Sequence, residues 1–240
     1  MRIKFFQKFI DIIRGKRKSF SIIAKENNIQ ITKKDKKFVL VNIQGINNNI
    51  IIENIKTNKG KIVINIFGDN NSVIIKDGFY LSSQLNLIIG QNHPYFGKVI
   101  NSKFLIDKNT SVESMQYVTF NSNTYCNIGE NCMLASNITI FNTDAHPVFN
   151  KDTREIINKV NGVEIGRHCW LGTNSTILKN TQIADDCIVG WGSVVSGKHL
   201  TPNCAIAGNP AKVVKENITW DSNGARFGYI ENVWEVFKNV

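Results

Sequence analysis

Proline and cysteine are scarce in this sequence of 240 residues, which contains four prolines and five cysteines. No two cysteines form a C-x-x-C pair, so a zinc site of the zinc-finger type is not expected. No apolar run approaches the ~20 residues that a membrane-spanning helix needs. The odd number of cysteines and the lack of a secretory signal peptide predict reduced thiols in a cytoplasmic protein.

Acidic residues are also in deficit. The 29 lysines and arginines outnumber the 19 aspartates and glutamates, which gives a formal net charge of +10 and a pI near 9.4. A basic protein suits an anionic partner, such as nucleic acid, an anionic membrane surface or a phosphate-bearing cofactor. Much of the excess lies within residues 2–37. No nucleic-acid-binding motif accompanies it, so nucleic acid is not an expected partner.

Isoleucine and asparagine are the abundant residues. β-Branched side chains favour strands, and asparagine tolerates the left-handed backbone of tight turns. Residues 21–105 contain short apolar runs at 37–43, 50–55 and 61–67, separated by asparagine and glycine. This pattern predicts N-terminal β coils over residues 21–105.

Residues 1–20 have a different pattern. Phenylalanine and isoleucine recur there at three- and four-residue spacing, with lysine and arginine between them. This spacing predicts a basic amphipathic helix. Such a helix would either lie on an anionic membrane surface as a peripheral contact, or pack on the rest of the protein or on a partner subunit.

A six-residue repeat dominates the second half of the sequence. A period of six fits neither an α-helix, with a period of 3.6, nor an exposed strand, with a period of 2. It fits short flat strands joined by tight turns, if three strands make a triangular coil and stacked coils share one core. Small residues follow many of the repeated aliphatic positions. The aliphatic column consists of Ile106, Val112, Val118, Ile128, Leu134, Ile140, Ile165, Leu171, Ile177, Ile183, Val189 and Val195.

The predicted fold is therefore all-β, a parallel β-helix whose hexapeptide-repeat domain covers residues 106–215. The register lapses at about 141–164, which is too long for a corner and predicts an excursion loop. Long loops on a rigid scaffold often carry function, and this one contains Asp144-Ala145-His146-Pro147. Residues 216–240 are rich in aromatic side chains and are predicted to form a C-terminal tail or helix.

From about residue 106 to 220 the sequence resembles the hexapeptide-repeat O-acetyltransferases, such as the galactoside, maltose and bacterial surface-polysaccharide acetyltransferases. The resemblance implies a left-handed β-helix, although parallel crossovers are ordinarily right-handed. The looped histidine and the following Gly-Asn-Pro tail are most similar to the surface-polysaccharide branch. The matching stretches are residues 144–147 (DAHP), 163–172 (VEIGRHCWLG), 189–195 (VGWGSVV) and 207–212 (AGNPAK).

The resemblance implies an enzyme that moves an acetyl group from acetyl-CoA to a sugar hydroxyl of a capsule, O-antigen or lipooligosaccharide. His146 matches the family's catalytic histidine, and an imidazole is suited to take the hydroxyl proton near neutral pH. Asp144 is close enough in sequence to orient that ring or to contact a sugar hydroxyl. Direct transfer is expected, because Cys126 and Cys132 are not placed to suggest a covalent acyl-enzyme. No metal is expected to be required.

Further site residues follow from the same resemblance. The N–H of Thr173, which follows Gly172, is expected to stabilise the negative oxygen of the tetrahedral intermediate. Trp170 is expected to wall the acceptor or pantetheine site. Trp191 stands where the family usually has a small residue, so it would narrow the acyl site or add a stacking surface. The residues expected to bind acetyl-CoA are Gly190, Trp191, Gly192, Ser196, Lys198, Lys212 and Lys215.

The family works as homotrimers, which implies that His146 of one subunit faces acetyl-CoA held partly by the next. The expected location is the cytoplasm, at the inner face of the membrane if the N-terminus contacts lipid. Two alternatives remain open: N-acetylation of an amino sugar on the same fold, and a non-catalytic β-helix scaffold. A γ-class carbonic anhydrase is disfavoured, because its paired histidines five residues apart are missing, and His93 and His199 have no motif support.

Overall fold

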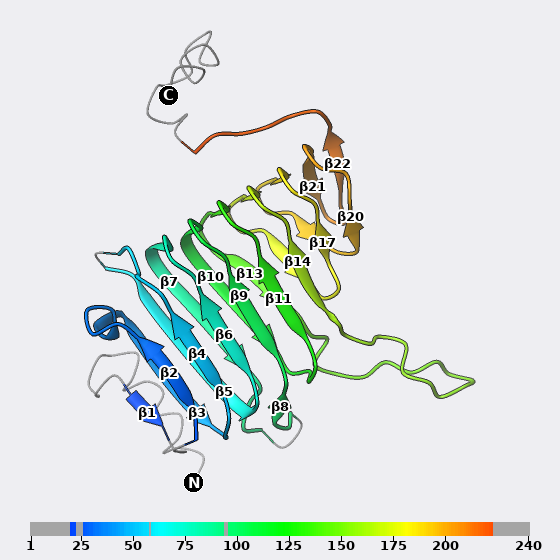
Figure 1. The fold of residues 1–240 in the computed structure, drawn as a ribbon. Helices are drawn as coiled ribbons and strands as arrows, with labels where there is room; N and C mark the ends of the chain where they lie inside the picture. The colour runs from blue at the N-terminus through cyan, green and yellow to red at the C-terminus, as the bar shows by residue number, and fades with distance from the viewer. Residues whose placement is uncertain (1–19, 23–25, 58, 94–95, 223–240) are drawn as a thin grey trace.

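The six-residue column of aliphatic side chains fills the interior of a three-sided stack of strands (Figure 1). The structure is a computed structural model that describes residues 20–22, 26–57, 59–93 and 96–222. All twelve column positions from Ile106 to Val195 are buried, with at most 3% relative exposure. No single coil can bury its apolar face alone, so the burial of these faces between stacked coils holds the coils together. The prediction of an all-β parallel β-helix is confirmed.

Three faces of parallel strands, here called A, B and C, surround this core. Face A contains β12 (Met133–Leu134), β15 (Trp170–Leu171), β18 (Ile188–Val189) and β21 (Ala205–Gly208). Face B contains β1 (Phe20–Ile22), β3 (Val39–Gln44), β5 (Lys61–Asp69), β7 (Tyr80–Ile89), β10 (Ser111–Thr119), β13 (Ile138–Phe141), β16 (Thr176–Leu178) and β19 (Val194–Val195). Face C contains β2 (Asn28–Ile31), β4 (Asn49–Ile52), β6 (Ser72–Ile75), β9 (Lys103–Ile106), β11 (Tyr125–Ile128), β14 (Gly162–Ile165), β17 (Gln182–Ile183) and β20 (Lys198–His199).

A few elements lie outside this simple pattern. The first residues of β10 pair with β12 on face A and its later residues with β13 on face B, with a register shift between Val112 and Ser114. The boundary expected between residues 105 and 106 falls inside β9 of the continuous face C. The remaining elements are the 3-10 turn η1 (Lys36–Phe38), β8 (Val99–Ile100), which pairs with β5, and β22 (Ala211–Lys215), which is antiparallel to β21.

Asparagine explains the tight corners between the faces. Asparagine adopts the left-handed backbone at lower cost than most residues, because its short side chain can hydrogen-bond locally. A corner can therefore turn without glycine, and the abundance of asparagine in the sequence has a structural cause. The corner asparagines with φ between 55° and 60° include Asn109, Asn131, Asn137, Asn174, Asn180 and Asn203.

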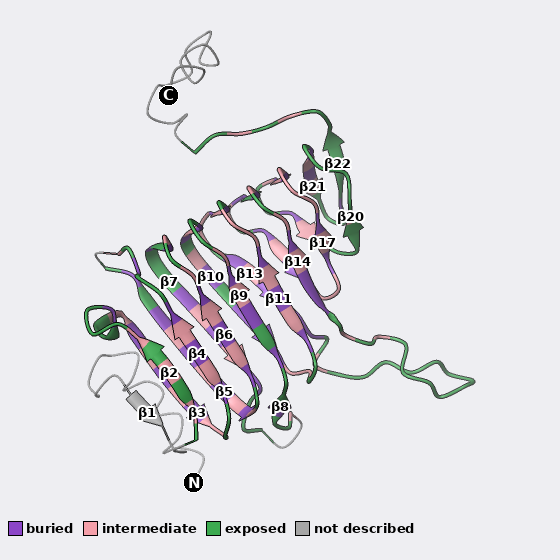
Figure 2. Cartoon of the chain, in the orientation of Figure 1, coloured by how far each residue is buried: buried purple, intermediate pink, exposed green. Residues whose placement is uncertain are grey.

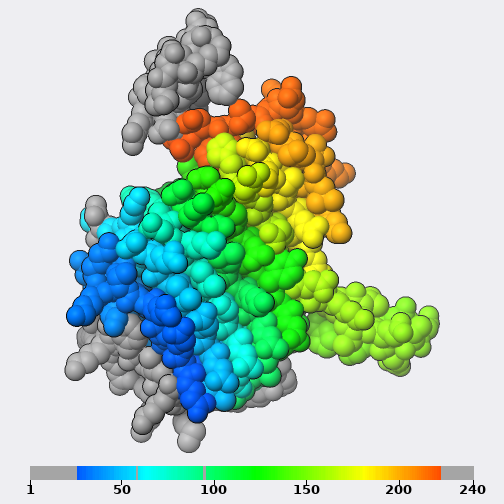
Figure 3. All heavy atoms as spheres, viewed as in Figure 1, coloured from blue at the N-terminus to red at the C-terminus, as the bar shows by residue number. Residues whose placement is uncertain are grey.

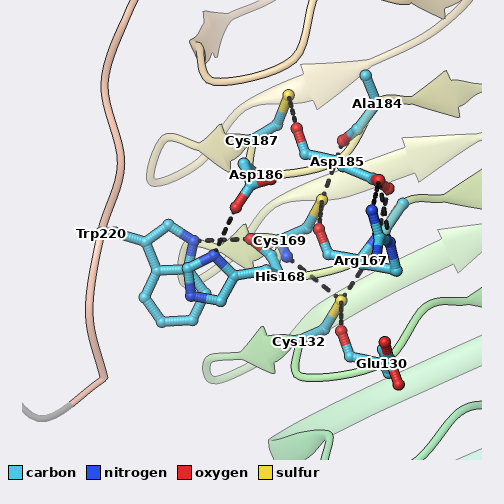
Figure 4. Close-up of polar contacts among 11 residues, drawn as sticks. Glu130, Cys132, Arg167, His168, Cys169, Ala184, Asp185, Asp186, Cys187 and Trp220 are labelled. Atoms are coloured by element: carbon cyan, nitrogen blue, oxygen red, sulfur yellow. Dashed lines mark hydrogen bonds and ion pairs between the residues drawn. The ribbon is translucent and has the colours of Figure 1, made fainter.

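Four cysteines stack in successive coils at the corner between faces C and A. The Cys132 thiol donates to the Gly166 carbonyl at 3.2 Å, and the Cys169 thiol donates to the Ala184 carbonyl at 3.2 Å (Figure 4). The Cys187 and Cys204 sulfurs are 3.6 Å apart, and neither forms a disulfide. Burial raises the pKa of Cys187 to about 12. These thiols act as small buried side chains that also satisfy backbone carbonyls.

One long excursion leaves the stack between β13 and β14 (Figures 1 and 3). It covers 142–161, which is shorter than the predicted 141–164, because Phe141 still belongs to β13 and 162–164 to β14. Figure 2 shows that most of the excursion is exposed, whereas buried and partly buried residues alternate along the strands. A second excursion, residues 90–98, lies between β7 and β8 and was not predicted.

The predicted N-terminal helix lies outside the described residues, as do residues 223–240. Residues 216–222 leave β22 without forming a further strand or helix. Among the described residues no helix is long and apolar enough to cross a membrane.

Candidate functional site

The corner between faces B and C carries His146, at the start of the excursion. Two side chains tie the base of this loop to the stack: Asn142 donates to the Tyr125 carbonyl at 3.0 Å, and Thr143 donates to Asn121 at 2.6 Å. The Thr143 hydroxyl also accepts the Ala145 N–H at 2.9 Å. Since Asn142 and Thr143 are buried, the backbone just before His146 is fixed to the rigid core.

Asp144 joins the two limbs of the excursion. Its carboxylate accepts a hydrogen bond from the Asn158 amide at 2.7 Å and pairs with Lys179 at 3.2 Å. The same Asn158 amide donates to the His146 carbonyl at 2.9 Å. Asp144 was expected to orient the imidazole or to contact a sugar hydroxyl. In the described structure it makes no hydrogen bond to the ring and instead holds the backbone around His146.

A pocket of about 470 Å³ opens at this corner. Asn121 and Asn123 line it from the corner of the stack, and Asn158 and Asn161 line it from the returning limb of the excursion. His146 faces the same space and is exposed. Each amide side chain offers both donors and an acceptor, which is the chemistry that can bind the hydroxyls of a sugar.

A second group of predicted site residues lies at the corner between faces A and B. Gly192 donates its N–H to the Thr173 carbonyl at 2.9 Å, which holds two successive coils together there. The Gly172 N–H is already bonded to the Val189 carbonyl at 2.8 Å, so it is not free to stabilise an oxyanion. The Thr173 N–H has no such partner within the described chain. Nothing lies within 4 Å of the space that a side chain on Gly192 would enter.

Trp170 lies on face A and meets the start of the C-terminal extension. The Trp220 indole stacks on the His168 ring, with centroids 4.4 Å apart and planes at 8°, and donates to the His168 carbonyl at 2.8 Å (Figure 4). The Nδ1 atom of the His168 ring lies 2.8 Å from the Asp186 carboxylate. Trp170 lies 6.0 Å from the Trp220 ring at 45°. The extension is therefore docked beside Trp170, which the resemblance places at the acyl site.

The predicted acetyl-CoA residues do not all come together in one chain. Gly190 and Gly192 lie at the same corner as Thr173, and Trp191 between them is 75% exposed. Lys212 and Lys215 are exposed on β22. Ser196 lies between β19 and β20, at the corner between faces B and C, and Lys198 is the first residue of β20 on face C. A single chain thus holds His146 and Thr173 at two different corners of the prism.

Several site residues were missed by the sequence prediction. Lys179 and Asn158 have no motif. The returning limb of the excursion brings Asn158 to Asp144, and the stacking of the next coil brings Lys179 there. Phe96 belongs to the unpredicted excursion 90–98, and its ring centroid lies 6.1 Å from that of His146. The sequence does contain a signal for the excursion that carries Phe96, because the coil that contains residues 90–98 has more residues than the coils before and after it.

A bacterial transferase hexapeptide model of six repeats matches residues 162–197 of the chain. This segment is therefore similar to the hexapeptide-repeat transferases. The matched segment contains Thr173 and Gly190 at the corner between faces A and B, but it does not reach the excursion with His146.

The proteins to which this chain is similar include two polysialic acid O-acetyltransferases. The protein from Escherichia coli O1:K1 / APEC is 32% identical over 120 residues, covering 50% of this chain and 38% of that protein. The protein from Neisseria meningitidis is 39% identical over 93 residues, covering 39% of this chain and 43% of that protein. The chain thus matches about two fifths of the length of each relative.

A solved structure extends the likeness to almost the whole chain. The structure of the polySia specific acetyltransferase NeuO superposes with a TM-score of 0.67 and 22% identity, covering 93% of this chain and 99% of that one. At this identity the likeness shows the fold. The left-handed β-helix that the sequence resemblance implied is confirmed.

Replacing Lys179 by methionine is expected to loosen the excursion. The change removes the ion pair with Asp144 and the 3.5 Å hydrogen bond to the Asn158 carbonyl, and it leaves the hydrogen bond from the Asn158 amide to Asp144. Limited trypsin digestion should then cleave after Arg154 up to about fivefold faster, as expected for the loss of a half-exposed ion pair. Lys76→Met removes an ion pair of the same 3.2 Å length, to Asp107, far along the stack and is the matched control. Equal cleavage of the two variants would show that the Lys179 pair does not hold the loop.

Proposed function

We propose that the chain is an acetyl-CoA-dependent O-acetyltransferase that modifies a sugar hydroxyl of a bacterial surface glycan. The observation that carries the proposal is the His146 excursion, which presents an exposed imidazole at an amide-lined pocket of about 470 Å³. The names of the two polysialic acid O-acetyltransferases support this substrate class. The net charge of +10 also suits an anionic glycan and an anionic acyl donor.

In the proposed reaction His146 takes the proton of the acceptor hydroxyl as the oxygen attacks the acetyl carbonyl. A carbon–oxygen bond forms, the carbon–sulfur bond of the thioester breaks, and the proton leaves with CoA as a thiol. The N–H of Thr173 would stabilise the oxygen that becomes negative during the attack. Asp144 would act on this step indirectly, because its contacts with Asn158 and Lys179 fix the backbone around His146.

The residues at the corner between faces A and B are chemically compatible with acetyl-CoA binding. Gly192 leaves open space beside the backbone, so an extended pantetheine arm can approach the free N–H of Thr173. Lys212 and Lys215 are exposed on β22, where their ammonium groups are available to phosphates. Trp191, which is 75% exposed, would add an apolar surface at this corner.

A homotrimer would complete the site, because His146 and Thr173 lie at different corners of one chain. The exposed apolar side chains of the excursion favour this assembly: Val148, Phe149, Ile156 and Ile157 are 46–62% exposed on a hairpin that projects from the stack (Figure 3). An apolar cluster of this kind is typical of an interaction surface. We propose that it packs on a neighbouring copy.

A solution mass of three 27.1 kDa chains, about 81 kDa, is therefore expected from light scattering. Phe149→Asp combined with Ile157→Asp should shift the protein towards the monomer, because each carboxylate would be buried without a partner. Val214→Asp is the matched control, since Val214 is 63% exposed at the far end of the stack on β22. A monomeric parent protein would rule out the shared site.

The deciding experiment is incubation with labelled acetyl-CoA and a glycan panel. The panel should hold polysialic acid, a neutral capsule, O-antigen, lipooligosaccharide and an amino sugar. Base-labile label on a glycan hydroxyl supports the proposal. Base-stable label on the amino sugar would identify an N-acetyltransferase, and the lack of transfer to every glycan would overturn the proposed function.

The proposed location is the cytoplasm, at the inner face of the membrane, where lipid-linked glycan precursors would be accessible. Residues 1–20, with their alternating aromatic and basic side chains, are the proposed peripheral contact.

A further inference from the structure

The described residues of the second excursion, 90–93 and 96–98, include contacts that fix both of its ends to the stack and one contact with His146. At its start Gly90 donates its N–H to the Thr119 carbonyl at 2.9 Å. At its end Lys98 pairs with Asp69 at 3.0 Å, and Val99 is fully buried in the core. The two ends of the loop are therefore anchored to the stack.

The most prominent of these side chains is Phe96. Its ring stacks on Phe120 with centroids 4.4 Å apart and planes at 21°. On another side it meets the His146 ring, with centroids 6.1 Å apart and planes at 48°. Both separations are within the range over which aromatic rings attract one another. The three rings form a continuous aromatic contact from the end of β10 to the proposed base.

The orientation of the His146 ring bears on its proposed role. Its backbone is held by Asp144 and Asn158, but its imidazole makes no hydrogen bond to any described residue. Among the described residues the aromatic ring that it meets is that of Phe96. A general base must present one ring nitrogen to the acceptor hydroxyl, so the orientation of the ring affects the rate directly.

We propose that Phe96 is a positioning residue for His146, with Phe120 as its support. The inference rests on the proposed function, because it gives His146 the role of general base. A flat ring on one side of the imidazole limits its rotation. Phe120 is well placed as a support, since it directly precedes Asn121, which receives the Thr143 hydrogen bond that fixes the loop.

The test compares Phe96→Leu, which keeps an apolar side chain but removes the ring, with Phe96→Tyr, which keeps the ring. Phe96→Leu is expected to lower kcat about tenfold through misalignment of the base, with the KM for acetyl-CoA unchanged. Phe96→Tyr should retain kcat within about twofold. Phe38→Leu is the matched control, because Phe38 is also half-buried but packs on the core far from the site.

A double-mutant cycle with His146→Ala separates positioning from a structural role. If Phe96 acts through the imidazole, Phe96→Leu should have no further effect on the residual rate once His146 is alanine. An equal loss of kcat in both backgrounds, or an unchanged kcat for Phe96→Leu in the parent, would overturn the inference. These outcomes require an active parent enzyme that depends on His146. An inactive parent would instead contradict the proposed function.

Discussion

His146→Ala is expected to lower the rate of acetyl transfer by about 10²- to 10⁴-fold, the usual effect of removing a general base. Without the imidazole, the acceptor hydroxyl must lose its proton to water as it attacks the thioester. Acetyl-CoA binding should persist, because the proposed donor groove is formed by Thr173 and Gly192 at another corner. Steady-state kinetics with the best glycan and calorimetric titration with CoA measure the two effects separately.

His199→Ala is the matched control for this experiment. His199 also lies near a corner of the stack, on β20, and its Nε2 is 3.1 Å from the Ser196 carbonyl. Its replacement should leave turnover unchanged within about twofold, the range expected away from the chemistry. If His146→Ala retained full turnover, His146 could not be the base. A loss of acetyl-CoA binding in that variant would place the histidine in the donor site.

Gly68→Ala is expected to destabilise the fold by about 3 kcal/mol or more, from a steric overlap combined with backbone strain. Gly68 has φ 155°, a region that L side chains rarely adopt, and a Cβ there would overlap the Val99 carbonyl of the next coil. A Cβ added at Gly45 would overlap the Gly68 carbonyl in the same way, one coil earlier. The close approach is backbone to backbone, so no side chain can move to relieve it.

Chemical denaturation followed by circular dichroism measures this loss. Gly97→Ala is the matched control, because no atom lies within 4 Å of its added Cβ and its backbone is outside the left-handed region. The Gly97→Ala variant should have a denaturation midpoint close to that of the parent protein. An equally stable Gly68→Ala protein would mean that the coils at this corner separate easily, in conflict with the packing described above.

Local spacing explains why so much of the fold could be predicted. The residues that form a coil are neighbours in the sequence, and coils repeat with little variation, so a six-residue period identifies inward positions such as Ile165 and Leu171 directly. Asparagine at the corners follows the same local rule, because its backbone preference does not depend on distant residues. The excursion with His146 was detectable as a break in that period.

The contacts around His146 could not be predicted in this way. Lys179 is 35 positions after Asp144, and it reaches the carboxylate only because the next coil stacks against the base of the excursion. Phe96 precedes His146 by 50 positions and approaches it because two excursions leave the same corner of the stack. Among the described residues Asp144 makes no hydrogen bond to the imidazole, because its carboxylate accepts the Asn158 amide and pairs with Lys179. Its alternative expected contact, with a sugar hydroxyl, stays a prediction.

The sequence alone determined the β-helix, its core positions, the excursion and the candidate base, because each depends on the order and spacing of nearby residues. Only the tertiary structure decided which side chains meet at the base and that His146 and Thr173 lie at separate corners. The physical reason is that stacking joins residues at whole-coil separations, and the length of each excursion sets those separations. No local pattern encodes them.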